Sequence, residues 1–282
     1  MVVFPNCKIN LGLSVLRKRP DNFHDLETIF YPLPFYDALE IVRKQENQIR
    51  DVPELKLPEG IMFRQTGIQL GIEPDDNICI GAWKLLKNDF PDLPGINIHL
   101  HKNIPVGAGL GGGSADAVFL LTAINNKFRL NLDDQQLHRY ALKLGSDCPF
   151  FLVNKPCLAT GRGEKLSVVD LDLSVYTIVI VNPGIHVNTG MAFSKIIPRL
   201  PVKSIADIVR LPIPEWKHQL VNDFEAPVFE MHPGIAALKE KLYTSGALYS
   251  AMSGSGSTVF GIFARGTAGN LSFPPDYIVR SF

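Results

Sequence analysis

The sequence predicts an α+β fold of two domains. Some segments alternate apolar and polar residues, as half-buried strands do, while others repeat apolar residues at helical spacing. The two kinds of segment follow one another without regular alternation, so we expect mixed or antiparallel sheets rather than a doubly wound sheet. A length of 282 residues favours two domains over one.

Two strands are predicted in the first half of the chain. From residue 7 to residue 15 the odd-numbered positions are apolar, whereas the even-numbered ones include Lys8 and Asn10. Residues 96–101 repeat this alternation. A period of two with one apolar face is typical of a half-buried strand, so Lys8 and Asn10 share the polar face of the first one.

Three helices are predicted in the same half. Residues 75–77 offer caps for a helix that begins near residue 78, and a second helix begins at Ser114. A third opens at residues 133–134, carries an apolar stripe and stops at Gly145.

The second half predicts further elements and a boundary. The apolar run 175–181 and residues 259–263 predict strands, residues 233–243 predict a helix, and the proline-rich stretch 198–214 predicts a surface connector. Turn-rich residues within 153–165 mark a domain boundary, which gives an N-terminal domain of residues 1–155 and a C-terminal domain of residues 156–282.

The composition excludes several classes of protein. Lys plus Arg equals Asp plus Glu at 28 each, so the broad basic field of a nucleic-acid or membrane-surface binder is absent. Four cysteines without C-x-x-C spacing predict reduced thiols rather than a disulfide framework. We expect a cytoplasmic protein, because no signal peptide or membrane-spanning run is apparent.

The glycine-rich run 105–115 is the main functional signal. It reads Pro-Val-Gly-Ala-Gly-Leu-Gly-Gly-Gly-Ser-Ala, with five glycines between Gly107 and Gly113. A backbone with few side chains lets amide groups approach an anion, and the start of the helix at Ser114 adds unpaired N–H groups. The run therefore predicts a phosphate-binding loop.

Three other interpretations of this run are weaker. A P-loop needs Lys after its second glycine, but Gly113 follows Gly112. Gly107, Gly109 and Gly112 fit a dinucleotide fingerprint, yet the preceding strand alternates and the expected acid, Asp133, starts a helix. A tight packing loop needs fewer glycines. A second glycine-serine segment, 253–258, is either a mobile turn or part of the same phosphate site.

Four segments together resemble one family. Residues 105–114 resemble the phosphate-binding motif of the GHMP (galactokinase, homoserine, mevalonate and phosphomevalonate) kinase superfamily. Residues 7–11, 21–28 (Asp-Asn-Phe-His-Asp-Leu-Glu-Thr) and 145–151 (Gly-Ser-Asp-Cys-Pro-Phe-Phe) are similar to further motifs of one branch. That branch phosphorylates 4-diphosphocytidyl-2-C-methyl-D-erythritol in the non-mevalonate isoprenoid pathway.

The resemblance implies an ATP-dependent small-molecule kinase. It implies two domains with the active site in the cleft between them, and transfer of phosphate to a hydroxyl of the methylerythritol part, which gives a 2-phosphate product. It also implies Mg²⁺ as cofactor and a substrate that carries a cytidine diphosphate group. We expect a monomer or a homodimer.

Site residues are implied position by position. The catalytic pair falls on Lys8 and Asp147, and the substrate contacts fall on Asn10, Phe23, His24, Thr189 and Phe193. Ser114 is the candidate metal ligand. The ATP contacts fall on Asn77, Lys102, Pro105, Val106, Gly107, Ala108, Gly109, Leu110, Gly111, Gly112, Gly113, Ser114 and Ala115.

The chain departs from the family at Asn22-Phe23, where the family has Gly-Tyr. Asn tolerates a left-handed backbone better than most residues, so we expect the turn to persist. Phe keeps a ring that can stack on a base but loses the hydroxyl of Tyr.

Other roles stay open for these residues. Without the resemblance, Lys8 is an exposed strand lysine and Asp147 a turn cap. Phe23, Phe193 and His24 are as compatible with structural roles. His99 and His101 suggest metal only weakly, since no third ligand is apparent. Arg162 and Glu164 have family counterparts without an evident role.

Three other functions compete with this prediction. A homoserine or mevalonate kinase would not need an aromatic pair for a base, and a non-catalytic nucleotide binder would not need both Lys8 and Asp147. An oxidoreductase would need the dinucleotide context that fails here.

Overall fold

The structure is a computed structural model that describes residues 1–44, 55–56, 60–69, 71, 73–269 and 271–282. Compactness divides the chain into two units, each built from three stretches. Unit 1 comprises Met1–Cys7, Phe35–Ile104 and Gly112–Asn154, and unit 2 comprises Lys8–Pro34, Pro105–Gly111 and Lys155–Phe282. The contiguous domains 1–155 and 156–282 are a different division and stay a prediction.

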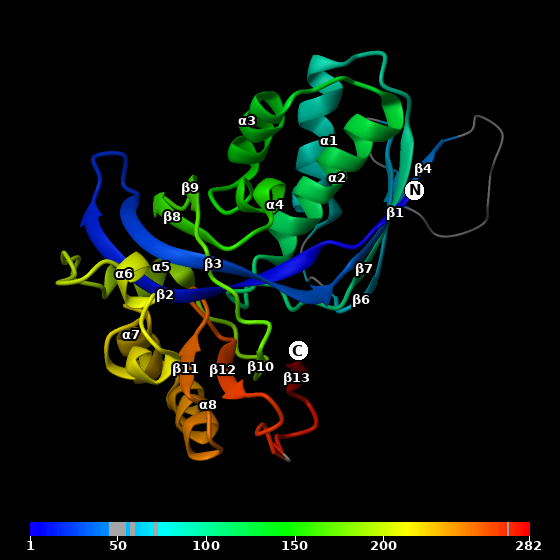
Figure 1. Ribbon diagram of the computed structural model, residues 1–282. Helices are drawn as coiled ribbons and strands as arrows, with labels where there is room; N and C mark the ends of the chain where they lie inside the picture. The colour runs from blue at the N-terminus through cyan, green and yellow to red at the C-terminus, as the bar shows by residue number, and fades with distance from the viewer. Residues whose placement is uncertain (45–54, 57–59, 70, 72, 270) are drawn as a thin grey trace. The chain divides into compact units, whose positions relative to one another are not determined.

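Unit 1 combines one mixed sheet with helices packed against it (Figure 1). The strand order is β1-β4-β7-β6-β5, in which only the β6–β7 pair is parallel. The strands are β1 (Val2–Val3), β4 (Ala38–Arg43), β5 (Leu55–Lys56), β6 (Met62–Gly67) and β7 (Ile96–Lys102). The helices are η1 (Pro74–Asp76), α1 (Ile78–Asp89), α2 (Gly112–Phe128), α3 (Asp134–Leu144) and α4 (Phe150–Val153).

One core holds unit 1 together. Leu39 and Ile98 of the sheet, Trp83 of α1 and Leu120 of α2 are all buried in it. Removal of such apolar surface from water is the main stabilising term of the unit.

Unit 2 contains two four-stranded sheets (Figure 1). One has the order β2-β3-β8-β9, from β2 (Asn6–Lys18), β3 (His24–Tyr36), β8 (Cys157–Gly161) and β9 (Lys165–Val168). The other is antiparallel in the order β11-β12-β10-β13, from β10 (Tyr176–Asn182), β11 (Tyr249–Met252), β12 (Val259–Ala264) and β13 (Ile278–Ser281). The helices are α5 (Thr189–Ser194), α6 (Ile205–Ile208), η2 (Ile213–His218), α7 (Glu225–Met231) and α8 (Pro233–Thr244).

Most predicted elements are confirmed, and their ends follow local chemistry. Asn77 caps α1, because its side chain accepts a hydrogen bond of 2.9 Å from the Cys79 amide. Asp133 caps α3 in a reciprocal pair with Gln136, and that helix ends at Gly145. Helix α2 begins at Gly112, two residues before the expected start.

Two expectations were wrong. The strand over residues 7–16 is not half-buried, since every residue of β2 from Asn6 to Leu13 is buried. Its polar face is covered by the glycine-rich loop, from which Leu110 accepts the Lys8 amide hydrogen bond at 2.9 Å. The stretch 198–214 is not only a surface connector, because it contains α6 and the start of η2 and buries three isoleucines, Ile205, Ile208 and Ile213.

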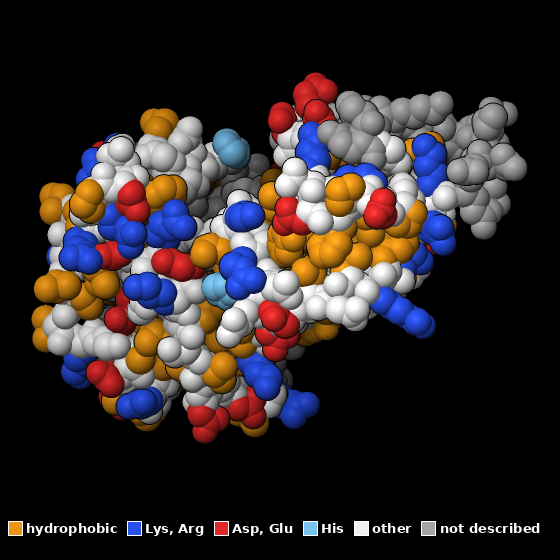
Figure 2. Space-filling model, turned by 90° about the horizontal axis from the view of Figure 1, so that it is seen from above, with side chains coloured by type: hydrophobic (Ala, Val, Ile, Leu, Met, Phe, Trp, Pro, Cys, Tyr) orange, Lys and Arg blue, Asp and Glu red, His pale blue; other side chains and the backbone are white. Residues whose placement is uncertain are grey.

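The surface agrees with a net charge of zero. Figure 2 shows acidic and basic side chains both spread over the face in view. In the part of the chain that the structure describes, no helix has the length and hydropathy needed to cross a bilayer.

Candidate active site

The glycine-rich loop of unit 2 turns its carbonyl groups toward the protein. The Ala108 carbonyl accepts a hydrogen bond from the Thr258 amide at 3.2 Å, and the Gly109 carbonyl accepts from the Lys8 ammonium at 3.1 Å. Gly107, Gly109 and Gly111 have positive φ of 62°, 78° and 69°. Among the described residues, no carbonyl or side chain accepts a hydrogen bond from the amides of residues 107–111. Unpaired amides on a compact loop are what an anion-binding site needs.

The second glycine-serine segment lies directly against this loop. The Ser253 hydroxyl donates to the Gly109 carbonyl at 2.8 Å, and a Cβ at Gly109 would lie 1.9 Å from the Ser253 carbonyl oxygen. Only glycine fits at position 109. The two segments therefore form one structure, as the interpretation of a shared site requires.

Lys8 is buried beneath the loop. Only 2% of the residue is exposed, and its ammonium donates to Asn10 Oδ1 at 2.6 Å and lies 4.9 Å from the centroid of the Phe30 ring. The alternative of an exposed strand lysine is excluded, because burial of this cation is maintained by specific acceptors.

Asn10 is held by residues that the sequence analysis did not single out. Its side-chain amide donates to Thr28 Oγ1 at 3.1 Å, and Thr28 in turn donates to the Gly12 carbonyl at 2.5 Å. The Asn10 backbone amide donates to Ser253 Oγ at 3.1 Å. These bonds fix the amide so that its oxygen faces Lys8.

Asn222 was also missed by the sequence analysis, and its side chain binds the backbone of the second glycine-serine segment. Its fully buried side chain donates to the carbonyls of Met252 and Gly254, each at 2.8 Å. No local sequence signal distinguishes this Asn from one in an ordinary turn.

In unit 1, the start of α2 contacts the turn that carries Asp147. The Ser114 hydroxyl hydrogen-bonds the thiol of Cys148, the next residue after Asp147. Burial raises the pKa of that thiol to about 12, the charge of Asp147 also raises it, and Ser114 opposes the rise. Cys148 is therefore an inert, protonated packing residue.

Lys102 is fully buried between two carboxylates of unit 1. Its ammonium is paired with Asp37 and donates to Asp116 Oδ2 at 2.7 Å. Asp37 also accepts the amides of Asn103 and Ile104 at 2.6 and 2.9 Å. The triad thus fixes the chain just before the loop and the helix just after it.

At pH 7 the group formed by Asp37, Lys102 and Asp116 holds one proton more than the ordinary pKa values of these residues would give, because Asp116 stays protonated. Burial raises the pKa of Asp116 to about 8 although Lys102 lowers it, and Asp37 raises it further. Burial alone would lower the pKa of Lys102, but the two carboxylates outweigh burial and raise it. The one carboxylate of α2, set among small and apolar residues in the first half of the helix, was the signal that could have revealed Asp116.

The predicted substrate residues of unit 2 form an aromatic group. His24 stacks on Phe193 with centroids 4.9 Å apart and planes at 14°, and Phe193 meets Phe224 edge-on at 4.7 Å. Burial, followed by the charge of Lys18, lowers the pKa of His24, so the ring is neutral at pH 7. Thr189 Oγ1 lies 2.9 Å from Ser255 Oγ, which connects this group to the second glycine-serine segment.

Phe23 does not join that stack. Half of it is exposed, and among the described residues its ring contact is with the Arg162 guanidinium, 4.6 Å from the ring centroid. Asn22 has a φ of 65°, so the expected left-handed turn is present.

The predicted residues thus fall into two groups. Unit 2 holds Lys8, Asn10, Phe23, His24, the loop from Pro105 to Gly111, Thr189 and Phe193. Unit 1 holds Asn77, Lys102, the loop end from Gly112 to Ala115 and Asp147. Asn77 and Lys102 have structural partners already, so their ATP contacts stay predictions.

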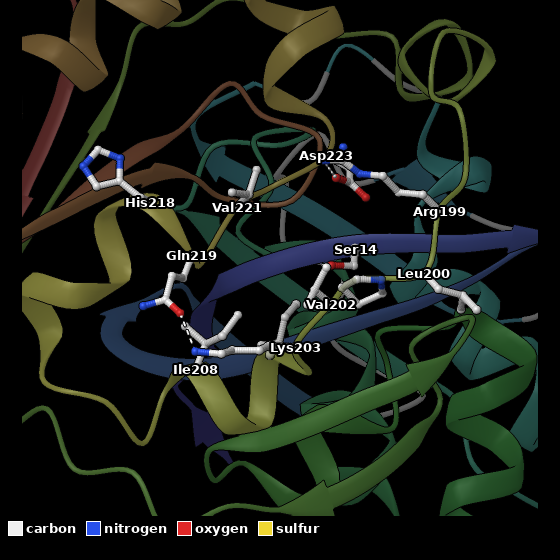
Figure 3. A pocket seen from close by; sticks show the side chains of 12 residues that line it. Ser14, Arg199, Leu200, Val202, Lys203, Ile208, His218, Gln219, Val221 and Asp223 are labelled. Carbon is white, nitrogen blue, oxygen red and sulfur yellow. Dashed lines mark hydrogen bonds and ion pairs between the residues drawn. The ribbon is translucent and has the colours of Figure 1, made fainter.

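A histidine pair and a pocket lie apart from the predicted site residues. His99 and His101 both bond Thr66 Oγ1, at 2.9 and 2.8 Å, and the described residues include no group of three metal-ligating side chains. Figure 3 shows a pocket of unit 2 lined by none of the predicted residues. Its cations are engaged, because Arg199 pairs with Asp223 and Lys203 donates to Gln219.

Comparisons with known proteins decide the family. The model of the GHMP kinases N terminal domain matches residues 77–155, and that of the GHMP kinases C terminal domain matches residues 208–271. A Bacteroides fragilis protein named 4-diphosphocytidyl-2-C-methyl-D-erythritol kinase is 48% identical over 264 residues, which are 94% of this chain and 92% of that protein. A protein of the same name from Syntrophus aciditrophicus is 39% identical and covers 91% of this chain and 87% of its own length.

This chain belongs to the 4-diphosphocytidyl-2-C-methyl-D-erythritol kinase family. A crystal structure titled 4-(cytidine 5'-diphospho)-2C-methyl-D-erythritol kinase superposes with a TM-score of 0.73 at 29% identity, and it covers 93% of this chain and 90% of the other. A homoserine kinase from Cytophaga hutchinsonii, at 17% identity and a TM-score of 0.66, shares the fold. The resemblance to GHMP kinases is confirmed, and so is the α+β class with mixed and antiparallel sheets.

Membership in this kinase family decides among the competing functions. The protein is an ATP-dependent kinase, and the assignment of the glycine-rich run to the phosphates of ATP stays a prediction. The oxidoreductase and the non-catalytic binder are excluded.

Proposed function

We propose that this kinase transfers the γ-phosphoryl group of ATP to a hydroxyl of 4-diphosphocytidyl-2-C-methyl-D-erythritol, giving the 2-phosphate in the non-mevalonate isoprenoid pathway. The observation that carries the phosphate-binding part is the set of unpaired amides at residues 107–111, next to the start of α2. Phosphoryl transfer asks a protein mainly for positioning and charge stabilisation, which such amides supply.

Asp147 is the proposed general base. Its turn contacts the start of α2 through Cys148 and Ser114, so the carboxylate lies in the same part of unit 1 as the end of the phosphate loop. A carboxylate here accepts the proton of the attacking hydroxyl as the bond to phosphorus forms.

Lys8 is the proposed electrostatic partner of the reaction. Its ammonium already bonds the Gly109 carbonyl of the loop, so its charge lies directly behind the amides that hold phosphate. A fixed cation at this place stabilises charge that develops on the transferred phosphoryl oxygens.

The Ser114 hydroxyl, at the third residue of α2, fits a magnesium ion that arrives with the nucleotide. Mg²⁺ keeps several waters and takes one or two protein ligands besides substrate phosphates, so a sparse donor set suits it. When bound, the ion neutralises phosphate charge.

The aromatic residues are proposed to bind the cytidine group. Phe193 is anchored by Phe224 and carries neutral His24 on one face, and Phe23 offers an exposed ring. A base stacks on either ring, and the neutral imidazole supplies one donor and one acceptor for its edge. Asn10 and Thr189 are proposed to contact the remaining polar groups of the substrate.

We also propose that the enzyme acts in the cytoplasm as a monomer or homodimer. All four cysteines are buried and none forms a disulfide, which suits a reducing compartment.

The test is ATP consumption with a panel of acceptors: 4-diphosphocytidyl-2-C-methyl-D-erythritol, homoserine and mevalonate. Turnover of the first alone is expected, with the product phosphorylated at the 2-position by ³¹P NMR. Turnover of homoserine or mevalonate without the first would overturn the proposal.

A further inference from the structure

The turn between β2 and β3 holds the backbone of Phe23 in place by hydrogen bonds. The Arg19 amide donates to the Phe23 carbonyl at 2.8 Å, and the Asn22 amide donates to the Arg19 carbonyl at 3.2 Å. Pro20 lies inside this turn, where its fixed φ is favourable, and Asn22 takes the left-handed conformation.

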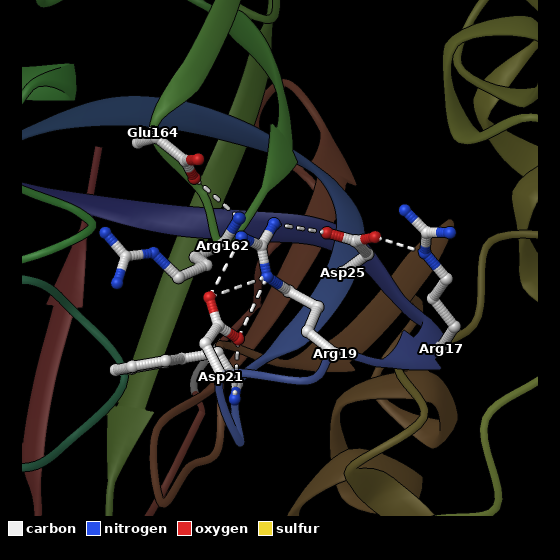
Figure 4. A network of polar contacts seen from close by, with 7 residues as sticks. Arg17, Arg19, Asp21, Asp25, Arg162 and Glu164 are labelled. Atoms are coloured by element: carbon white, nitrogen blue, oxygen red, sulfur yellow. Dashed lines mark hydrogen bonds and ion pairs between the residues drawn. The ribbon is translucent and has the colours of Figure 1, made fainter.

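Arg19 locks the tip with two carboxylates (Figure 4). Its guanidinium donates to both oxygens of Asp21 at 2.9–3.1 Å and to Asp25 Oδ1 at 2.9 Å. Asp21 also accepts the Phe23 amide at 3.2 Å. The backbone of Phe23 is therefore fixed from both sides, while its ring has no polar group to fix it.

Arg162 comes from the neighbouring β8–β9 turn. Strand β8 pairs with β3 and ends with Gly161 opposite Leu26, which brings the turn to the start of β3. Gly161 has a φ of 70°, and the Glu164 carboxylate lies 2.8 Å from where a Cβ would stand. That carboxylate accepts the Arg162 amide at 2.5 Å, so Glu164 holds the backbone from which the Arg162 side chain extends (Figure 4).

The guanidinium of Arg162 makes a cation–π contact with the Phe23 ring rather than an ion pair. It lies 4.6 Å from the Phe23 centroid. In the described ranges no carboxylate is within ion-pair distance of it, although, after the hydrogen bond from Arg19, its charge helps to lower the pKa of Asp21. A planar guanidinium stacks on an aromatic face better than an ammonium does.

We propose that Arg162 is a specificity-determining positioning residue, which holds Phe23 from one face so that the opposite face can stack on the cytosine of the substrate. Glu164 acts indirectly, because it fixes the turn that presents Arg162. This inference rests on the proposed function.

The test is steady-state kinetics of Arg162→Ala and Arg162→Lys with 4-diphosphocytidyl-2-C-methyl-D-erythritol. We expect Arg162→Ala to raise KM for this substrate about three- to tenfold, because the variant loses the cation–π contact between the guanidinium and the Phe23 ring. The kcat and the KM for ATP should stay unchanged. Arg162→Lys should recover only part of the loss. Lys165→Ala, which removes an exposed cation from the same hairpin, should leave all three constants unchanged.

A second background separates action through the ring from direct contact with substrate. In Phe23→Leu, the change Arg162→Ala should have no further effect on KM. An equal effect in both backgrounds, or none in the wild type, would overturn the inference. Failure of the wild type to turn over this substrate would instead overturn the proposed function.

Discussion

The side-chain oxygen of Asn10 accepts a hydrogen bond of 2.6 Å from the ammonium of Lys8, and both residues lie on the buried polar face of β2. The pair fixes a cation directly beneath the carbonyl of Gly109. The proposed phosphate loop and the lysine proposed to balance its charge are thus parts of one hydrogen-bonded structure.

Asn10→Leu should lower kcat by roughly tenfold or more, because Lys8 loses an acceptor for its charge and its position. KM for ATP should change little. The measurement is steady-state turnover with ATP and the cytidylyl substrate. If kcat stayed unchanged and only KM for the cytidylyl substrate rose, Asn10 would act through its proposed substrate contact alone and would not position Lys8.

Asp147→Asn should reduce kcat roughly a hundredfold or more while KM for ATP is kept, because the amide cannot accept the proton of the attacking hydroxyl. Single-turnover kinetics with purified variant check this. The matched control is Asp134→Asn, an exposed carboxylate in the first turn of α3. Wild-type turnover in Asp147→Asn would remove the carboxylate from the mechanism.

Gly109→Ala should raise KM for ATP at least tenfold. The new Cβ would lie 1.9 Å from the Ser253 carbonyl oxygen, so the two glycine-rich segments must separate. Gly184→Ala is the control, because Gly184 has a similar φ of 72° but nothing within 4 Å of its Cβ position. It should cost about 1–2 kcal/mol of stability and leave ATP binding intact. Normal ATP affinity in a folded Gly109→Ala protein would contradict the loop assignment.

Asp116→Asn should change how stability depends on pH. Burial raises the pKa of Asp116 from 3.8 to about 8, so between these values the folded protein keeps a proton that the unfolded chain releases. Stability from this group is full below pH 4 and is lost as pH rises toward 8.

The measurement is urea unfolding of both proteins from pH 5 to pH 8. The unfolding free energy of the wild type should fall more steeply with pH than that of Asp116→Asn, by up to about 1.4 kcal/mol per pH unit. Asp89→Asn is the control, because the hydrogen bond from Tyr140 lowers the pKa of Asp89 and places its window below this range. Parallel slopes for wild type and Asp116→Asn would rule out the shared proton in the triad.

Local patterns were sufficient to predict much of the fold. The caps at Asn77 and Asp133, the stop at Gly145 and the left-handed Asn22 follow from side-chain chemistry within a few residues, so the sequence alone predicts them. The glycine-rich loop could also be predicted, because its conformation depends on glycine residues, which have no side chain.

The sequence did not predict that the polar face of β2 is buried. The sequence shows that Lys8 and Asn10 share a face, but that face is covered by segments about 100 and 240 residues away, the loop at Gly109 and the segment at Ser253. The roles of Asn222 and of Lys102 could not be predicted for the same reason. Asn222 bonds Met252, and Lys102 pairs with Asp37 and Asp116, so the partners lie in other elements of the fold.

The sequence by itself determined the family, the glycine-rich loop and the local shape of most elements, because these depend on residue order over short stretches. Only the tertiary structure decided which polar groups are buried and what satisfies them. It placed Arg162 over Phe23 through the pairing of β8 with β3, and it placed Phe193 of helix α5 on His24 of β3. Neither contact follows from spacing along the chain, because the partners come from different elements.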